Sequence, residues 1–236
     1  VLRGLASLYG LRSEHEKALQ MGERILRLAD HLDDMDMKTE GLLVTGYNLA
    51  FNENMQSGLE RIERAISLYN SRRQRARRAG VGSYSAIVGL TASAFFLWMR
   101  GYPDRAQSRA ADSIALAQEL NHVYSLTYAQ FHNGLLHMWL RNPEIALESA
   151  EVVLQLAESH GFHIWSAIGS CLRAAALIKT GVTDEGLTLI EQGMNTYRGL
   201  KTPPVFWPLL LHLCAGAYGA ASRPEEGLRL LDEALV

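Results

Sequence analysis

The sequence predicts an all-α solenoid of about six antiparallel helix pairs with a period of about 40 residues. The first observation is a pair of small residues twelve positions apart, clearest as Ala94 and Ala106 on either side of a Gly-Tyr-Pro turn. The second is that this pair occurs six times, at offsets of 40, 48, 40, 40 and 41 residues. The third is that β-branched residues never alternate for more than a few positions, which argues against strands. The pairs are Ala6 with Ala18, Gly46 with Gly58, Ala94 with Ala106, Gly134 with Ala146, Ala174 with Gly186, and Ala215 with Gly227.

Each small pair is predicted to mark the crossing of two helices. Antiparallel helices approach closely only where the side chains between them are small. Leucine in place of Ala106 or Ala146 should therefore overpack the crossing and cost about 1–3 kcal/mol.

Apolar periodicity and turn residues predict two helices in each of six copies, at about 1–35, 36–78, 79–121, 122–161, 162–201 and 202–236. Pro103 and Pro143 open second helices, where the missing N–H costs nothing. The expected first helices are Leu2–Tyr9, Met37–Phe51, Ser83–Arg100, Val123–Leu140, Ile164–Thr180 and Val205–Ala221. The expected second helices are Glu16–His31, Gln56–Tyr69, Pro103–Leu120, Pro143–Ser159, Thr183–Arg198 and Pro224 to the end.

Composition narrows the class of protein. Of 236 residues 48% are hydrophobic, and the formal net charge of −2 provides no field for nucleic acid or an anionic membrane. No apolar stretch reaches the roughly 18 residues that a membrane span needs. The cysteines, Cys171 and Cys214, fall in predicted helix interiors, which favours a reducing, cytoplasmic location. Both ends fall inside helical pattern, so we expect a single repeat domain that is part of a longer polypeptide.

The arginine run Arg72–Arg78 coincides with the long offset of 48 residues. A solvated helix C-terminus explains it, because cations stabilise that end of the helix dipole. Phosphate binding is the alternative, but no aromatic residue interleaves the arginines. A second periodic feature is an aromatic residue near the start of four first helices, predicted to plug adjacent copies together: Tyr84, Tyr124, Trp165 and Trp207.

The sequence shows no pattern for catalysis or for a cofactor. It contains no phosphate-binding loop and no glycine fingerprint after a strand. His132 and His137 are five residues apart, which puts them on different faces of a helix and argues against a zinc pair. We therefore expect no catalytic, cofactor-binding or metal-binding residue and no enzyme activity in these 236 residues.

The small pair resembles the tetratricopeptide repeat (TPR), in which a small residue of one helix answers an alanine of the next across a glycine-containing turn. Ala94, Gly101 and Ala106 match that motif, as do Ala174, Gly181 and Gly186. The resemblance implies a right-handed solenoid whose helices are about one turn longer than in the usual 34-residue repeat.

Longer segments resemble one family more specifically. They are Leu97–Ala106, Ala115–His122, Ser159–Phe162 and Pro224–Leu228. They look like the C-terminal repeat region of bacterial proteins that join a nucleotide cyclase domain and an AAA (STAND-type) ATPase to a TPR array. That resemblance implies a regulatory region that senses a partner or ligand. The stretch Ala79–Gly82 departs from the Asp-Pro-Gly loop usual there.

In such arrays the first helices line a concave groove, and this groove is the candidate binding site. Its expected wall is rich in aromatic and methionine side chains, an apolar surface suited to a peptide. Packing between copies is the alternative for each residue. The wall comprises Leu43, Tyr47, Phe51, Phe95, Trp98, Met99, Tyr128, Phe131, Leu135, Trp139 and His212, with Cys171 and Lys179 at matching positions.

These observations predict a non-catalytic interaction or effector-sensing scaffold of a larger bacterial signalling protein. The expected partner is a protein or peptide, which includes other domains of the same polypeptide, and a homo-oligomer is an option; membrane and nucleic acid are not expected. Two alternatives remain: a small-molecule sensor, as in repeat-containing transcription activators, and a self-association or spacer module.

Overall fold

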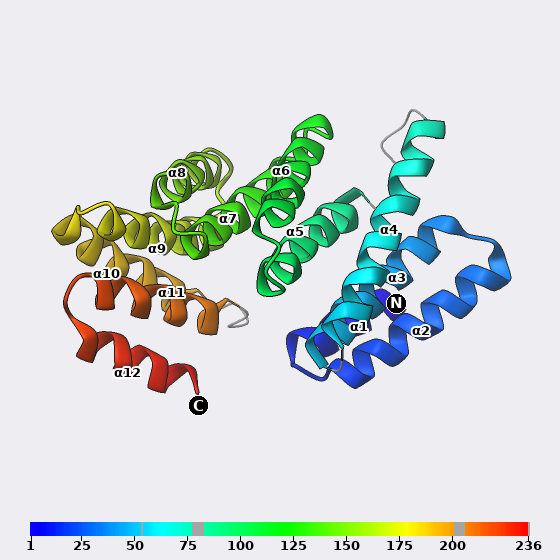
Figure 1. Cartoon of the computed structure of the whole chain (residues 1–236), viewed down its shortest axis with the longest axis horizontal. Coiled ribbons are helices and arrows are strands. Elements are labelled where there is room, and N and C mark those ends of the chain that lie inside the picture. The colour runs from blue at the N-terminus through cyan, green and yellow to red at the C-terminus, as the bar shows by residue number, and fades with distance from the viewer. Residues whose placement is uncertain (53, 77–82, 201–205, 236) are drawn as a thin grey trace. The chain divides into compact units, whose positions relative to one another are not determined.

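The computed structural model describes residues 1–52, 54–76, 83–200 and 206–235, and these form twelve α-helices and no strand (Figure 1). We call the first helix of each pair an A helix and the second a B helix. The A helices are α1 (Leu2–Leu11), α3 (Met35–Asn52), α5 (Ser83–Met99), α7 (Val123–Trp139), α9 (His163–Lys179) and α11 (Trp207–Ala220). The B helices are α2 (His15–Leu32), α4 (Met55–Ala76), α6 (Pro103–Glu119), α8 (Pro143–His160), α10 (Thr183–Gly199) and α12 (Pro224–Ala234).

The chain divides into two compact units, Val1–Ser125 and Leu126–Val236. In unit 1, α1 packs on α2, α3 on α4 and α5 on α6, and each pair contacts the next. In unit 2, α9 packs on α10 and α11 on α12, and α8 contacts α9. Figure 1 shows α9 to α12 following one another across unit 2. The two predicted helices of every copy are present, while a single domain over 1–236 remains a prediction.

The small pairs lie at places where the two backbones of a pair approach closely. A Cβ atom added to Gly46 would lie 2.8 Å from the carbonyl oxygen of Gly58. One added to Gly227 would lie 2.8 Å from the carbonyl oxygen of Ala215. Side chains beyond Cβ have no room at these positions, so the crossings hold scaffold residues.

Where both members of a pair are alanines, the two side chains are buried. In the first copy, Ala6 of α1 is 2% exposed and Ala18 of α2 is fully buried. In the third copy, Ala94 of α5 and Ala106 of α6 are buried in the same way. Ala18 is therefore a crossing residue of the scaffold, and it offers no surface to a ligand.

The turns from A to B helices share one hydrogen bond, which closes the C-terminus of the A helix. In each copy an N–H donates to the carbonyl five residues earlier in the last helical turn, as from Tyr102 to Leu97 at 2.9 Å and from Asn142 to His137 at 2.9 Å. In the described turns the residue before the donor takes a left-handed conformation, with φ of 80° at Gly101 but 62° at Arg141. A glycine is therefore favoured at this position but is not required in every copy.

Successive pairs meet through a contact that we call the B-to-A contact. In unit 1 it joins α2 to α3: a Cβ added to Gly22 would lie 2.6 Å from Thr45 Cγ2 and 2.9 Å from Val44 Cγ1. One added to Gly41 would lie 2.8 Å from Leu26 Cδ2. In unit 2 the matching contact joins α8 to α9: a Cβ added to Gly169 would lie 2.8 Å from Val153 Cγ1 and 3.3 Å from Leu154 Cδ2. Leucine side chains of a B helix thus fit against glycines of the next A helix.

The largest difference from the predicted bounds is in the second copy. The helix predicted to end at Tyr69 continues to Ala76, so α4 takes up part of the extra length that the long repeat offset provides. The side chains of the run Arg72–Arg78 and the stretch Ala79–Gly82 lie outside the described residues. Among the described helices, none is long and apolar enough to span a bilayer.

Candidate functional site: an exposed apolar row on the A helices of unit 1

Three exposed apolar side chains, Leu11, Phe51 and Met99, form what we call the A-helix row. Each lies five residues after the small crossing residue of its own helix, so the three occupy one repeat position. Their exposed fractions are 58%, 51% and 46%. Since α1 contacts α3 and α3 contacts α5, the row runs across neighbouring helices. Large apolar side chains gathered outside a core are typical of an interaction surface.

Aromatic neighbours hold Phe51, the central side chain of the row. Its ring lies 5.2 Å from that of Phe96, measured between centroids, in an edge-to-face arrangement. The ring of His15 stacks on it at 5.8 Å, and Tyr47 lies 4.9 Å away. Phe96 is buried, whereas Phe51 and Tyr47 are partly exposed. Such pairs restrict the rings, so this part of the surface is ordered before any partner binds.

A buried amide orients the histidine at the row. His15 Nδ1 lies 3.0 Å from Asn48 Oδ1, and the Asn48 amide donates to the carbonyl oxygen of Val44 at 2.8 Å. Desolvation of the hydroxyl raises the pKa of Tyr47 above its ordinary value of 10.0, and a tyrosine is protonated at neutral pH with or without this shift. The row therefore has a polar edge but no fixed negative charge from Tyr47.

A charged network ties α5, which carries Met99 of the row, to the B helices α4 and α6. Arg109 of α6 donates to Glu63 of α4 through Nε at 2.9 Å, and Ser93 of α5 donates to the same carboxylate. Burial alone would raise the pKa of Glu63, but these hydrogen bonds outweigh it and the pKa is lowered. The carboxylate thus remains ionised and links α4, α5 and α6.

Unit 2 places the matching side chains differently. Phe131 and Leu135, predicted for the groove wall, are fully buried, and Leu43 of unit 1 is also buried. For these three the exposed-wall prediction is wrong and the alternative of core packing is right. For Phe131 the physical reason is that its ring packs against Trp165 at 5.7 Å and Phe206 at 5.9 Å, aromatic residues of the next two copies.

His132 lies beside this aromatic cluster. Its Nδ1 lies 2.8 Å from the carbonyl oxygen of Tyr128, and its ring lies 5.3 Å from that of Phe131. Burial lowers the pKa of His132 to about 4. The imidazole is therefore neutral at pH 7, and it acts as a core side chain.

The other predicted wall residues are divided between surface and core. Phe95, Trp98, Tyr128 and Trp139 are half-buried, His212 and Lys179 are exposed, and Cys171 is buried. At the row position, unit 2 carries Trp139, Lys179 and Ala220 instead of three exposed apolar side chains. Among the described residues, the exposed apolar side chains of the predicted wall, Tyr47, Phe51 and Met99, thus lie in unit 1.

Two features of the structure were missed in the sequence analysis. Leu11 was missed because the first helix was predicted to end at Tyr9, although its repeat offset from Phe51 could have identified it. Cys171 and Cys214 are both free and buried, and they interact across α9 and α11. The hydrogen bond to Cys171, together with burial, raises the pKa of the Cys214 thiol, which makes it an inert core residue.

The four periodic aromatic residues do not share one role. Trp165 is buried, as a plug between copies should be. Trp207 stacks on Tyr197 at 5.6 Å and donates to Glu233 at 2.9 Å. Tyr84 and Tyr124 are each 40% exposed, and burial together with the nearby Tyr124 raises the pKa of Tyr84, so a plug role for these two stays a prediction.

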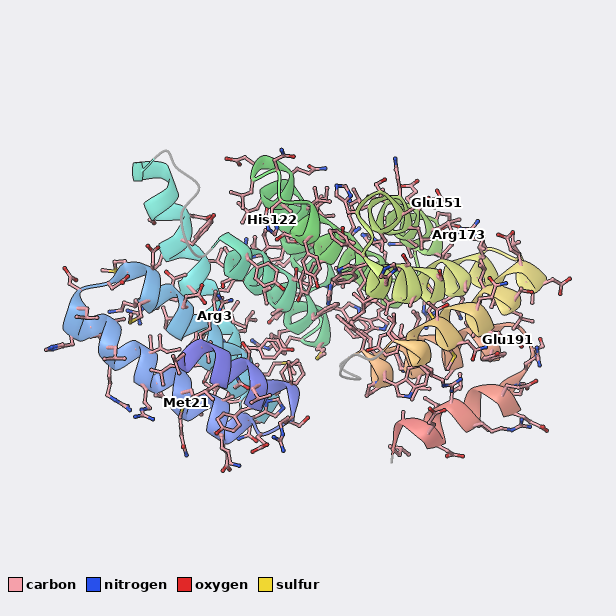
Figure 2. All side chains as sticks on the ribbon, turned by 180° about the vertical axis from the view of Figure 1, so that it is seen from behind. Arg3, Met21, His122, Glu151, Arg173 and Glu191 are labelled. Atoms are coloured by element: carbon pink, nitrogen blue, oxygen red, sulfur yellow. The ribbon has the colours of Figure 1, made fainter. Side chains whose placement is uncertain are left out.

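Within the described ranges, no three His, Cys, Asp or Glu residues lie close enough together to hold a metal ion. Most ion pairs lie on the surface. One example joins Arg173 of α9, labelled in Figure 2, to Glu185 of α10 at 2.8 Å. Exposed pairs of this kind contribute little to stability and nothing to chemistry.

Comparison with protein-family models finds no match, and comparison with curated proteins finds none. Comparison with solved structures does find matches. The apo form of RapI superposes with a TM-score of 0.78 at 10% identity, over 99% of this chain and 80% of that one. The kinesin light chain TPR-like repeats of Podosopora anserina match with a TM-score of 0.57 at 17% identity, over 82% and 91%.

A third structure is that of a complex. The Rap conjugation gene regulator of the plasmid pLS20, in complex with the Phr* peptide, matches with a TM-score of 0.64 at 14% identity, over 98% of this chain and 71% of that one. At these identities the likeness is one of fold. The chain is a TPR-like helical solenoid, as the small pairs and their period predicted.

Proposed function

We propose that this chain is a non-catalytic protein-interaction scaffold and that the A-helix row of unit 1 binds an apolar segment of its partner. The observation that carries the proposal is the row itself: Leu11, Phe51 and Met99 share one repeat position and are each about half exposed. Neighbouring packed helices lie about 8–10 Å apart, so the row offers three anchors at about that spacing.

The spacing favours an extended peptide as the occupant. A polyproline II segment rises about 3.1 Å per residue and presents every third side chain on one face, about 9 Å apart. Three apolar peptide side chains, one at every third position, would therefore each contact one side chain of the row. Full burial of one such side chain is worth about 1.5–3 kcal/mol before the cost of ordering the peptide. The Rap protein whose structure contains the Phr* peptide has the same fold, which supports a peptide over a rigid surface.

The sequence resemblance supplies the wider context of the proposal. In a bacterial cytoplasmic signalling protein with cyclase or ATPase domains, the bound segment would come from another domain or from a partner protein. Binding of the segment to the row would then shift the output domain toward the conformation in which the row binds the segment more tightly, by an amount set by the difference in affinity. A small-molecule effector is the competing occupant, and the experiment below distinguishes the two.

The test is selection of peptides from a random display library against the wild-type chain, followed by affinity measurement with variants. Phe51→Ser combined with Met99→Ser should weaken the selected peptides at least about tenfold, because two anchors lose their apolar contact. Both residues are exposed, so the fold should survive, which circular dichroism checks. Val182→Ser is the matched control, since Val182 is nearly as exposed as Met99 but lies in an A-to-B turn of unit 2. Equal affinity of the double variant, or failure of any peptide to bind, would overturn the proposal.

A further inference from the structure

Two arginines contact an exposed tyrosine next to the Met99 end of the A-helix row. Arg100 Cζ lies 5.8 Å from the centre of the Tyr102 ring, and Arg105 Cζ lies 5.4 Å from it. Arg100 directly follows Met99, the last residue of α5, and Arg105 is in the first turn of α6. All four side chains are exposed. The ring therefore holds two positive charges at the border of the candidate binding surface.

Among the described residues, neither Arg100 nor Arg105 forms an ion pair with a carboxylate. The charge of Arg105 does act on Glu63, but that carboxylate already accepts hydrogen bonds from Arg109. Asp104 is exposed in the first turn of α6, where the helix dipole stabilises its negative charge. The N–H donors of a guanidinium lie in its own plane, so contact with the face of a ring leaves them open to a carboxylate. Both arginines therefore keep donors for an acidic partner group.

The first copy carries basic residues at the same two repeat positions and neutralises them. Arg12 and Lys17 lie six and eleven residues after their crossing residue, as the two arginines of the third copy do. The residue eight positions after the crossing is Glu14 in the first copy and Tyr102 in the third. Arg12 Nε lies 3.0 Å from Glu14 Oε1, and Lys17 donates to Glu14 Oε2. Both copies have one acidic residue ten positions after the crossing, so the two turns differ by the charge at position eight.

We propose that Arg100 and Arg105 bind a carboxylate of the partner segment, from an aspartate or glutamate beside the apolar side chain that contacts Met99. This rests on the proposed function, because the carboxylate belongs to the segment that the A-helix row binds. The first copy supports a carboxylate as the group, since Glu14 bridges the two basic positions there. At the other end of the row, Leu11 adjoins basic residues that are already paired. The segment therefore binds in one direction, with its acidic residue at the Met99 end.

The peptides selected against the wild-type chain from the random display library are the probes for the test. An acidic residue should flank their apolar side chains on one side. Replacing this residue by its amide should weaken binding to the wild type about three- to tenfold at low salt, the range expected of one or two exposed ion pairs. Arg100→Gln combined with Arg105→Gln should abolish this difference between the acidic and the amide peptide. Arg12→Gln combined with Lys17→Gln is the matched control and should preserve the difference.

Tyr102→Glu is the converse variant, because it places a carboxylate where the first copy has Glu14. It should abolish the preference for the acidic peptide although both arginines remain. Equal binding of the acidic and amide peptides to the wild type, or a difference that survives in the double arginine variant, would contradict the inference. If Phe51→Ser with Met99→Ser still weakens those peptides, the proposed function stands without it. A library that yields no binding peptide refutes both.

Discussion

Unit 1 and unit 2 share the same scaffold but differ in how exposed the large side chains of their A helices are. Both have small crossings and left-handed A-to-B turns, yet at the row position unit 1 exposes Leu11, Phe51 and Met99. In unit 2 the A-helix aromatic residues Phe131 and Trp165 are almost fully buried, and Tyr128 and Trp139 are half-buried. The backbone pattern of the repeat therefore does not decide where a surface for binding lies. Side chains contributed by the following copies decide it.

The largest expected difference between the two units is in how much an aromatic-to-alanine substitution lowers the free energy of unfolding. Phe131→Ala should lower the free energy of unfolding by about 3–5 kcal/mol, because a buried ring is replaced by a cavity. Phe51→Ala should cost at most about 1 kcal/mol, because half of that side chain is already in water. Urea unfolding of both variants gives the two values. Equal losses would mean that the row of unit 1 is as much a core as the cluster of unit 2.

A change of pH should act on unit 2 through His132. Its pKa is about 4 in the folded protein and about 6.5 in the unfolded chain, so the unfolded chain binds more protons between these values. The free energy of unfolding is then highest above pH 6.5 and falls by about 2–3 kcal/mol as the pH is lowered to 4. His132→Phe should remove this part of the pH dependence, as seen in urea unfolding at several pH values. If the His132→Phe variant kept the wild-type dependence of unfolding free energy on pH, that dependence would come from other titratable groups.

The crossings should show the smallest difference between the units, because they are common to both. Gly58→Ala in unit 1 places a Cβ 2.5 Å from the carbonyl oxygen of Gly46, and Gly186→Ala in unit 2 places one 2.9 Å from that of Ala174. Each should cost about 1–3 kcal/mol, because backbone atoms must move apart. Gly216→Ala is the control: nothing lies within 4 Å of its Cβ, and this substitution inside a helix should add about 0.5–1 kcal/mol. Thermal unfolding of the three variants is the measurement, and a neutral Gly58→Ala would refute the close crossing.

The fold was predictable because it depends on local rules. Small residues at a fixed spacing, prolines in the first turn of B helices and apolar periodicity each act within one copy, and they located both helices of every pair. Whether a predicted wall residue is exposed or buried depends on which side chains of other copies pack against it. Phe131 is in the core because Trp165 and Phe206 pack against it, and no spacing within its own helix contains that information. The row was partly found, since Phe51 and Met99 were predicted and Leu11 was not.

The turn that ends each A helix has a consequence for how the chain folds. The hydrogen bond from Tyr102 to Leu97 and its equivalents close each helix pair over a few residues, so the turn of each pair is set by local sequence. The described helix contacts likewise join neighbours along the chain or successive A helices. Proteins with such low contact order fold within about microseconds to milliseconds. Each pair can then serve as a nucleus from which order spreads to adjacent pairs, and the chain can gain or lose a pair without a new folding pathway.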